Sequence, residues 1–477
     1  MKLLKNMFYN TSYQLLTLLL PLVTVPYVSR VLSPQGIGIN AYTSSIVMYF
    51  TLFGALGISL YGNREIAFVQ SNKYKRSKIF WELVVLKLAS VSIATLLFFG
   101  FVLLTNEWQL FYLIQGINLL ATATDISWYF IGVEDFKIIV IRNTIVKLIT
   151  VVLTFLVVKT PDDLALYMFL IAFASLLGNL TVWHHLKHEI IKIPFSRLDI
   201  LIHLRPTLML FLPQITMQIY LSLNKSMLGA MDSVVSAGYF DQSDKIIRIL
   251  FTIVSAIGGV FLPRLSSLFS SGKEKQAKAL LLKLVDLSNA ISMLMIAGVV
   301  GVSSTFAVFF FGKGYEAVGP LMAVESLMII CISYGNALGT QYLLASRRTK
   351  AYTMSAVIGL VANVVLNILL IPILGAMGAI ISTVITEFIV SLYQAISLRD
   401  VFTFKELTRG MLRYLIAATL SGAVLYYINT QMSVSLVNYV IQSLVAVTIY
   451  VGIVFITKAP VIQLFRDFRK EHRTWNI

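Results

Sequence analysis

Basic side chains that fall inside strongly apolar stretches are the residues of this sequence best suited to chemistry. Lys147 is the clearest case, because it lies near the middle of its stretch and shares a helical face with Asn143, Thr150 and Thr154. No carboxylate on the same stretch could neutralise it. A lysine or arginine at the centre of a membrane helix costs about 2.5–3.5 kcal/mol. We therefore expect Lys147 to face a water-filled cavity and to bind an anion.

Three further cations interrupt apolar stretches. Lys87 lies about a turn and a half into its stretch, so its ammonium could instead extend to the cytoplasmic interface. Lys245 and Arg248 could pair with Asp241 and Asp244, which lie four residues earlier, so an ion pair and a binding role both stay open. Arginine binds phosphate through two parallel hydrogen bonds, and lysine acts as a point charge. Cations of these types predict a phosphate-bearing substrate.

Polar side chains also recur at spacings of three and four residues within several apolar stretches. One stripe contains Gln14, Thr17 and Thr24, and another contains Gln214, Gln218 and Lys225. Such stripes favour a wet cavity, with hydrogen bonding between helices as the alternative. Together with the cations, they select these candidates for binding an anionic substrate: Arg30, Lys87, Lys147, Gln214, Gln218, Lys225, Lys245 and Arg248.

Carboxylates inside apolar stretches could couple ion movement to transport. Asp125, Asp244 and Glu325 are the candidates, because a desolvated carboxylate takes up a proton more readily than an exposed one. The alternative for each is a structural ion pair with one of the cations. We expect no cofactor, with proton or sodium coupling as the energy source.

Motifs typical of enzymes and metal sites are absent from the sequence. There is no phosphate-binding P-loop and no H-E-x-x-H motif, and Cys331 is the single cysteine, which excludes an internal disulfide. His184, His185 and His188 fall together, but a polar cluster at a helix end explains them better than a metal site. We predict neither catalytic residues nor metal ligands.

The elements that must position these residues are membrane helices. Hydrophobic residues make up 58% of the chain and charged residues 13%, whereas a soluble domain is about half apolar and a quarter charged. A crossing needs about 20 mainly apolar residues. The sequence predicts an all-α polytopic membrane protein with fourteen spans: 8–28, 40–60, 81–105, 110–133, 138–158, 164–186, 206–228, 238–262, 284–311, 320–345, 351–371, 376–398, 411–429 and 435–457.

Lysine and arginine residues gather in every second gap between these spans. The gap after the second span holds Arg64, Lys73, Lys75, Arg76 and Lys78, whereas the gap at 106–109 holds no basic residue. Because cytoplasmic loops retain basic residues, both termini are expected in the cytoplasm. This bias also explains the net charge of +16 without nucleic acid as a partner.

The spans divide into three parts by position. Residues 1–205 would form an N-terminal lobe of six helices, 206–400 a C-terminal lobe of six, and 401–477 the last two helices with a basic tail. The two lobes share weak repeats, because a Leu-Pro pair precedes a basic residue in the first and seventh spans. The tail at 459–475 is either an amphipathic helix beside anionic membrane lipids or a solvated segment.

The chain resembles the Wzx-type polysaccharide repeat-unit flippases, which belong to the multidrug/oligosaccharidyl-lipid/polysaccharide exporter superfamily. The resemblance rests on the fourteen-span plan, on the segment from Arg30 to Gly38 (RVLSPQGIG) and on Gly238-Tyr239-Phe240. It implies two six-helix lobes in a V around a central cavity, plus two C-terminal helices, in the cell (inner) membrane. Residue by residue, Arg30 and the Gly36/Gly38 turn carry over.

The resemblance also implies a substrate and partners. The substrate would be a polyprenyl-pyrophosphate-linked oligosaccharide repeat unit. By alternating access it would move from the cytoplasmic to the outer leaflet for capsule, O-antigen or exopolysaccharide assembly. A polysaccharide polymerase and chain-length machinery would be partners.

Three alternatives remain open from the sequence. A lipid II flippase would share the span plan and the anionic substrate. A multidrug/cation antiporter of the same superfamily would be expected to have twelve spans and an acidic cavity. A membrane polysaccharide polymerase, which would be an enzyme, would be expected to carry a long basic outer loop, and none is present here.

Overall fold

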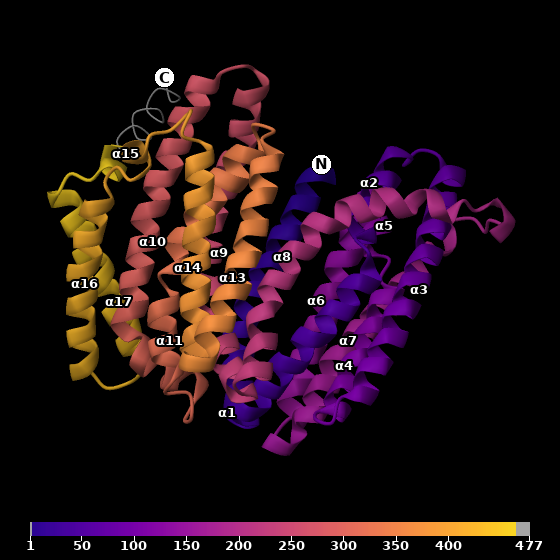
Figure 1. The fold of residues 1–477 in the computed structure, drawn as a ribbon, viewed down its shortest axis with the longest axis horizontal. Coiled ribbons are helices and arrows are strands. Elements are labelled where there is room, and N and C mark those ends of the chain that lie inside the picture. Colours follow the sequence, from indigo (N-terminus) through magenta and orange to yellow (C-terminus); the bar gives the residue numbers. More distant parts are fainter. Residues whose placement is uncertain (1, 464–477) are drawn as a thin grey trace. The chain divides into compact units, whose positions relative to one another are not determined.

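The computed structural model describes residues 2–463 (Figure 1). Side chains are described throughout this range except at 2–12, 15, 188, 212–214, 216, 217, 221, 257 and 260. The described chain is helical and contains no strand. It separates into two compact units, residues 1–238 and 239–477, and each is described here by itself.

Unit 1 contains eight α-helices and the start of a ninth. They are α1 (Lys2–Ala55), α2 (Ile58–Phe68), α3 (Lys73–Leu104), α4 (Gln109–Thr124), α5 (Ser127–Gly132), α6 (Phe136–Val157), α7 (Leu164–Trp183), α8 (Leu204–Met231) and the first turn of α9 (Val234–Ser270). Short 3-10 helices lie between α6 and α7 (η1, Pro161–Asp163) and between α7 and α8 (η2, His184–His188; η3, Phe195–Arg197; η4, Ile200–His203).

Unit 2 contains the rest of α9, eight further α-helices and a π-helix between α12 and α13. They are α10 (Glu274–Phe311), α11 (Val318–Glu325), α12 (Met328–Tyr334), the π-helix η5 (Gly335–Leu344), α13 (Thr349–Leu374), α14 (Ala376–Ser397), α15 (Phe404–Leu407), α16 (Met411–Gln431) and α17 (Leu436–Ile456). Helices α13 and α14 pack against each other, and α16 packs against both α10 and α17.

Helix α1 is two arms joined at a sharp break. Ser33 has φ 64° and ψ 166°, outside the helical region, because the following Pro34 disfavours a helical conformation in the residue before it. Figure 1 shows the chain running from the N-terminus to the far end of unit 1 and returning towards α2. The first arm contains the predicted span 8–28, and the second contains most of the span 40–60, whose end lies beyond Ala55 in α2.

Glycines let the second arm of α1 meet the start of α9. A Cβ built on Gly38 would lie 1.9 Å from the carbonyl oxygen of Val234, and one on Gly238 would lie 2.9 Å from that of Pro34. Backbone therefore packs directly on backbone at this crossing. Gly38, one of the two glycines of the predicted turn, is thus required for packing.

The predicted span at 110–133 is interrupted. Helix α4 ends at Thr124, Asp125 adopts an extended conformation, and α5 begins at Ser127. Discontinuous helices of this kind place backbone polar groups and short side chains at a break inside a helix bundle. The break puts Asp125 beside the site described below.

Membrane spans are abundant in the described chain, but their count differs from the prediction. Ten helices are long and apolar enough to cross a membrane, or eleven if the bent pair within α9 is one span. One of them, Leu16–Phe68, includes both arms of α1. A multi-pass all-helical fold is confirmed, and the count of fourteen is not.

The outer faces of the helices suit a lipid environment. Leu96, Leu103 and Leu104 on α3 are 73–85% exposed, and Ile373 on α13 is 76% exposed. Large apolar side chains exposed on many helices are expected where the surroundings are hydrocarbon.

Helix α8 belongs to unit 1, because it packs along α1 and α2. The division of the chain at 205/206, made from the sequence, stays a prediction. The basic part of the predicted tail lies outside the described residues.

Candidate functional site: a basic polar cavity in unit 1

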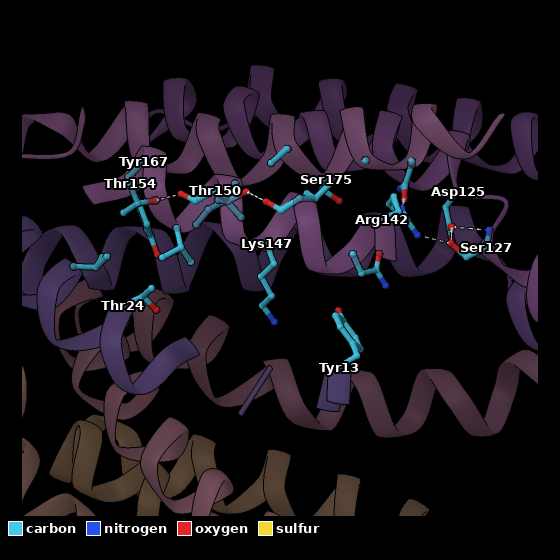
Figure 2. A pocket seen from close by; sticks show the side chains of 18 residues that line it. Tyr13, Thr24, Asp125, Ser127, Arg142, Lys147, Thr150, Thr154, Tyr167 and Ser175 are labelled. Carbon is cyan, nitrogen blue, oxygen red and sulfur yellow. Dashed lines mark hydrogen bonds between the residues drawn. The ribbon is translucent and has the colours of Figure 1, made fainter. Parts of the chain in front are cut away.

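A polar cavity of about 530 Å³ lies within unit 1 (Figure 2). Helix α1 contributes Tyr13 and Thr24, and the α4–α5 break contributes Asp125 and Ser127. Helix α6 lines most of one side, because residues at spacings of three and four share one helical face. Those residues are Arg142, Asn143, Val146, Lys147, Thr150, Val151 and Thr154. Helix α7 completes the wall.

Lys147 projects into this cavity without a carboxylate partner. Figure 2 shows Lys147 and Tyr13 directed into the open space from different helices. The ammonium lies 5.9 Å from the centroid of the Tyr13 ring, a cation–π distance. Within the described part of the chain, no ion pair or hydrogen bond of the Lys147 side chain is found. Its charge is therefore available to a ligand.

Arg142 is a cavity residue that the sequence analysis missed. One guanidinium nitrogen donates to Asn179 Oδ1 at 2.5 Å, and another donates to Ser127 Oγ at 2.9 Å. Asn179 in turn donates to the carbonyl of Ala121 at 2.7 Å. Arg142 lies near the start of the predicted span 138–158, four residues before Val146, and continues the face of Thr150. Extending the helical stripe by one turn would have found it.

Asp125 and Lys87 form a buried polar junction at the α4–α5 break. The Lys87 ammonium donates to the backbone carbonyl of Asp125 at 2.7 Å and lies 3.9 Å from its carboxylate. The carboxylate accepts from the backbone N–H and the hydroxyl of Ser127, at 2.9 and 2.5 Å. Lys87 is only 2% exposed, so its ammonium does not extend to an interface.

A second cavity, of about 450 Å³, shares Asp125, Ser175 and Asn179 with the first. It is lined by Lys87 and by two polar side chains of α4, Gln115 and Asn118. The described lining of the two cavities carries three cations (Lys87, Arg142 and Lys147) and one carboxylate (Asp125). This excess of positive charge inside a bundle of apolar helices favours an anionic ligand.

In unit 2 the predicted cations are paired along α9. Lys245 lies 2.5 Å from Asp241, and Arg248 lies 2.7 Å from Asp244, both with i,i+4 spacing. These are the ion pairs considered as the alternative to a binding role. Both cations remain partly exposed, at 42% and 37% of their side-chain area.

Glu325 of α11 is fully buried beside this group. It accepts a hydrogen bond from the Ser243 hydroxyl, and its carboxyl group is within hydrogen-bonding reach of Asp244. A hydrogen bond between two carboxyl groups needs one of them to hold a proton. Asp244 and Glu325 are therefore brought together, as a site that could exchange a proton.

The remaining candidates do not join either group. Arg30 is exposed just before the break in α1, and Gln218 and Lys225 are half-buried on α8. None of the three lines a described cavity with Lys147. The side chain of Gln214 lies outside the described set. Over the described residues, no group of histidine, cysteine and carboxylate side chains is arranged to hold a metal.

The fold and the cavities define a polytopic α-helical membrane protein with a basic internal site. Residues 3–269 match the family model described as "Polysaccharide biosynthesis protein", which covers more than half of the chain, and the chain belongs to that family.

Two relatives of known name are similar over most of their length. The chain is 27% identical to the "Putative O-antigen transporter" of Shigella dysenteriae over 380 residues, which is 79% of this chain and 94% of the relative. It is 24% identical to the protein of the same name in Escherichia coli (strain K12) over 395 residues, 81% and 94% of the two chains.

The fold is that of a known flippase structure. The lipid II flippase MurJ in an inward closed conformation matches with a TM-score of 0.75, covering 97% of this chain and 99% of that one, at 16% identity. At this identity the match establishes the fold alone.

Proposed function

We propose that this protein is a flippase, not an enzyme, that translocates an anionic lipid-linked saccharide across a membrane. The observation that carries the proposal is the excess of cations in the two neighbouring cavities of unit 1, where Lys147 makes no ion pair or hydrogen bond with a described side chain. The family and the transporter names of the relatives support the same class of activity.

The substrate that best fits the cavity is a polyprenyl-pyrophosphate-linked oligosaccharide repeat unit. Lys147 and Arg142 would neutralise the pyrophosphate, Arg142 by turning part of its fork from Asn179 and Ser127 towards the ligand. Asn143 and Thr150 on the same face of α6 would hydrogen-bond to sugar hydroxyls. Both named relatives are O-antigen transporters by their printed names.

Alternating access would move the head group from the cytoplasmic to the outer leaflet of the inner membrane. With both termini in the cytoplasm and a potential negative inside, exporting one uncompensated negative charge gains about 2.3 kcal/mol per 100 mV. A doubly charged head group would gain about twice as much unless ions move with it. A polymerase and chain-length machinery would use the exported unit.

Ion coupling would reside in the buried carboxylates. Asp244 pairs with Arg248 and lies close to the buried Glu325, and these two carboxyl groups would take up and release the coupled ion. Asp125 is the second candidate, since it touches both unit 1 cavities. Glu325→Gln should abolish ion uptake that accompanies export in proteoliposomes. The exposed loop variant Glu316→Gln should leave it unchanged, and equal uptake by both variants would exclude Glu325.

A lipid II flippase is the second candidate, because its substrate presents the same pyrophosphate to the same cations and its fold is shared. The test is deletion of the gene, followed by analysis of lipid-linked sugars on each leaflet. Accumulation of a polyprenyl-linked repeat unit on the cytoplasmic leaflet, reversed by the wild-type gene, is the expected result. Accumulation of lipid II would assign the second function, and an unchanged lipid distribution would refute both.

A further inference from the structure

A third polar cavity, of about 720 Å³, lies at one end of unit 2. Its walls come from the end of α9, the first turns of α10, residues 345–348 after η5, and the segment that follows α14. The connections at this end carry the basic residues that the sequence assigns to the cytoplasm. None of its residues has a role in the proposed transport.

Two of the cations in this cavity are already neutralised. Arg348 donates two parallel hydrogen bonds to Asp400, at 2.9 and 2.6 Å, and holds the pKa of that carboxyl below its usual value. Lys278 lies 2.8 Å from Glu406 and 5.6 Å from the centroid of the Phe402 ring. These pairs fix the wall of the cavity and leave little charge for a ligand.

Two other cations in the lining remain available. The side chains of Lys275 and Arg347 are exposed and make no ion pair or hydrogen bond with the described residues. Ser266, also in the lining, has a hydroxyl that is equally uncommitted there. Four cations and two carboxylates (Glu274 and Asp400) line the cavity, and Glu406, the partner of Lys278, adds a third carboxylate. Its surplus charge is positive.

Arg347 is also held in an unusual backbone conformation. Its φ is 62°, in the left-handed region that non-glycine residues seldom adopt. This conformation closes the end of the helical segment, where the N–H groups of Arg347 and Arg348 donate to the carbonyls of Leu344 and Leu343. Glycine would adopt this φ without steric cost, but the residue at this point of the cavity wall is an arginine.

We propose that this cavity binds a phosphate-bearing anion, with Arg347 and Lys275 as its charged contacts and Ser266 as a hydroxyl donor. The ligand would join the first turn of α10 to the connection between η5 and α13. The same phosphate chemistry is offered by an anionic lipid head group in the adjacent leaflet and by a soluble phosphorylated compound. A ligand that binds only the folded unit raises its stability by mass action.

The test measures the thermal unfolding midpoint of the full chain in phosphatidylcholine nanodiscs. One arm titrates inorganic phosphate at constant ionic strength, and the other adds phosphatidylglycerol to the discs. The variants are Arg347→Gln with Lys275→Gln as a pair, Arg347→Gly alone, and Lys350→Gln as an exposed control that does not line the cavity.

In wild type and Lys350→Gln, the thermal unfolding midpoint should rise with ligand concentration and then saturate. The variant with both Arg347→Gln and Lys275→Gln should need at least about tenfold more ligand for the same rise. A response to phosphate identifies a soluble ligand, and a response to phosphatidylglycerol alone identifies a lipid. Arg347→Gly removes the cation and the strained φ together, so it should unfold at a higher temperature without ligand yet lose the response. This variant keeps the test decisive if the paired variant fails to fold. No response of wild type in either arm, or an equal response in the cavity variants, overturns the proposal.

Discussion

Lys147 differs from the other predicted cations in its surroundings. Lys87 is held by the Asp125 carbonyl, and Lys245 and Arg248 have carboxylates one turn away. A cation that already has a partner contributes less binding free energy, because its existing interaction must be broken before it can contact a ligand. Among the described side chains, the interaction found for Lys147 is the cation–π contact with the Tyr13 ring. Of these four cations, it should contribute most to binding.

Replacing Lys147 by glutamine should lower export of the lipid-linked unit by about tenfold or more. The reason is that a charge-assisted hydrogen bond contributes about 1.5–3 kcal/mol. Polymer output of a deletion strain that carries the variant measures the effect, with the amount of protein in the membrane measured alongside.

The matched control is Lys137→Gln, which removes an exposed cation at the start of the same helix, outside the cavity. It should support normal output. If Lys147→Gln is as active as Lys137→Gln, then Lys147 does not contact the substrate.

At the scale of elements, the crossing of α1 with α9 depends on glycine. Gly38→Ala should destabilise the protein by about 1–3 kcal/mol or more, because its Cβ would overlap the backbone of Val234, which cannot rotate away. The unfolding midpoint of the purified protein measures this loss.

Gly100→Ala in α3 is the control, since a Cβ there meets nothing within 4 Å. In a helix, alanine is favoured over glycine by up to about 1 kcal/mol, so this variant should be neutral or more stable. Equal midpoints for the two variants would mean that α1 and α9 do not approach each other so closely.

The connection between α7 and α8 is held by a buried hydrogen-bonded network. Glu82 of α3 accepts from the backbone N–H of Asp199 at 2.7 Å and lies 2.9 Å from Nε2 of His203. Nδ1 of the same ring lies 2.9 Å from the Tyr61 hydroxyl of α2. All three side chains are at most 5% exposed. A neutral imidazole that donates from Nε2 and accepts at Nδ1 satisfies every partner.

Glu82→Ala should therefore cost about 1–3 kcal/mol, since it leaves the buried Nε2–H of His203 and the backbone N–H of Asp199 without an acceptor. Limited proteolysis should then cleave residues 184–203 faster than in wild type. Glu189→Ala removes an acidic partner of Arg76 that is 44% exposed, and such a pair contributes less than about 1 kcal/mol. Similar cleavage rates for the two variants would rule out the network as the anchor of this connection.

Local rules predicted some of these elements and missed others. The break in α1 follows from the Ser33-Pro34 step and its glycines, which the sequence displays. The break at Asp125 carries no proline or glycine, and it is stabilised by Ser127 and by Lys87, which is 38 residues away in the chain. The environment of Arg142 likewise depends on Asn179 of another helix. Helical spacing in the sequence predicts which residues share a face of a helix. The side chains that contact this face come from distant parts of the chain, so they are known only from the packed fold.

At the scale of the whole molecule, orientation in the membrane follows from where the basic connections lie. Single cysteines placed in a Cys331→Ser background test it. Four exposed sites are used. Lys75 in unit 1 and Lys273 in unit 2 lie in basic segments, which are expected in the cytoplasm. Asp162 in unit 1 and Ser433 in unit 2 lie in connections that are expected on the outer side. An impermeant thiol reagent added to intact spheroplasts should label Asp162→Cys and Ser433→Cys only, and lysis should expose the other two.

Labelling of Lys75→Cys from outside would mean that unit 1 has the opposite orientation in the membrane. Labelling of Lys273→Cys from outside while Lys75→Cys stays protected would mean an odd number of crossings between them. That result would contradict the alternation of charge on which the topology rests.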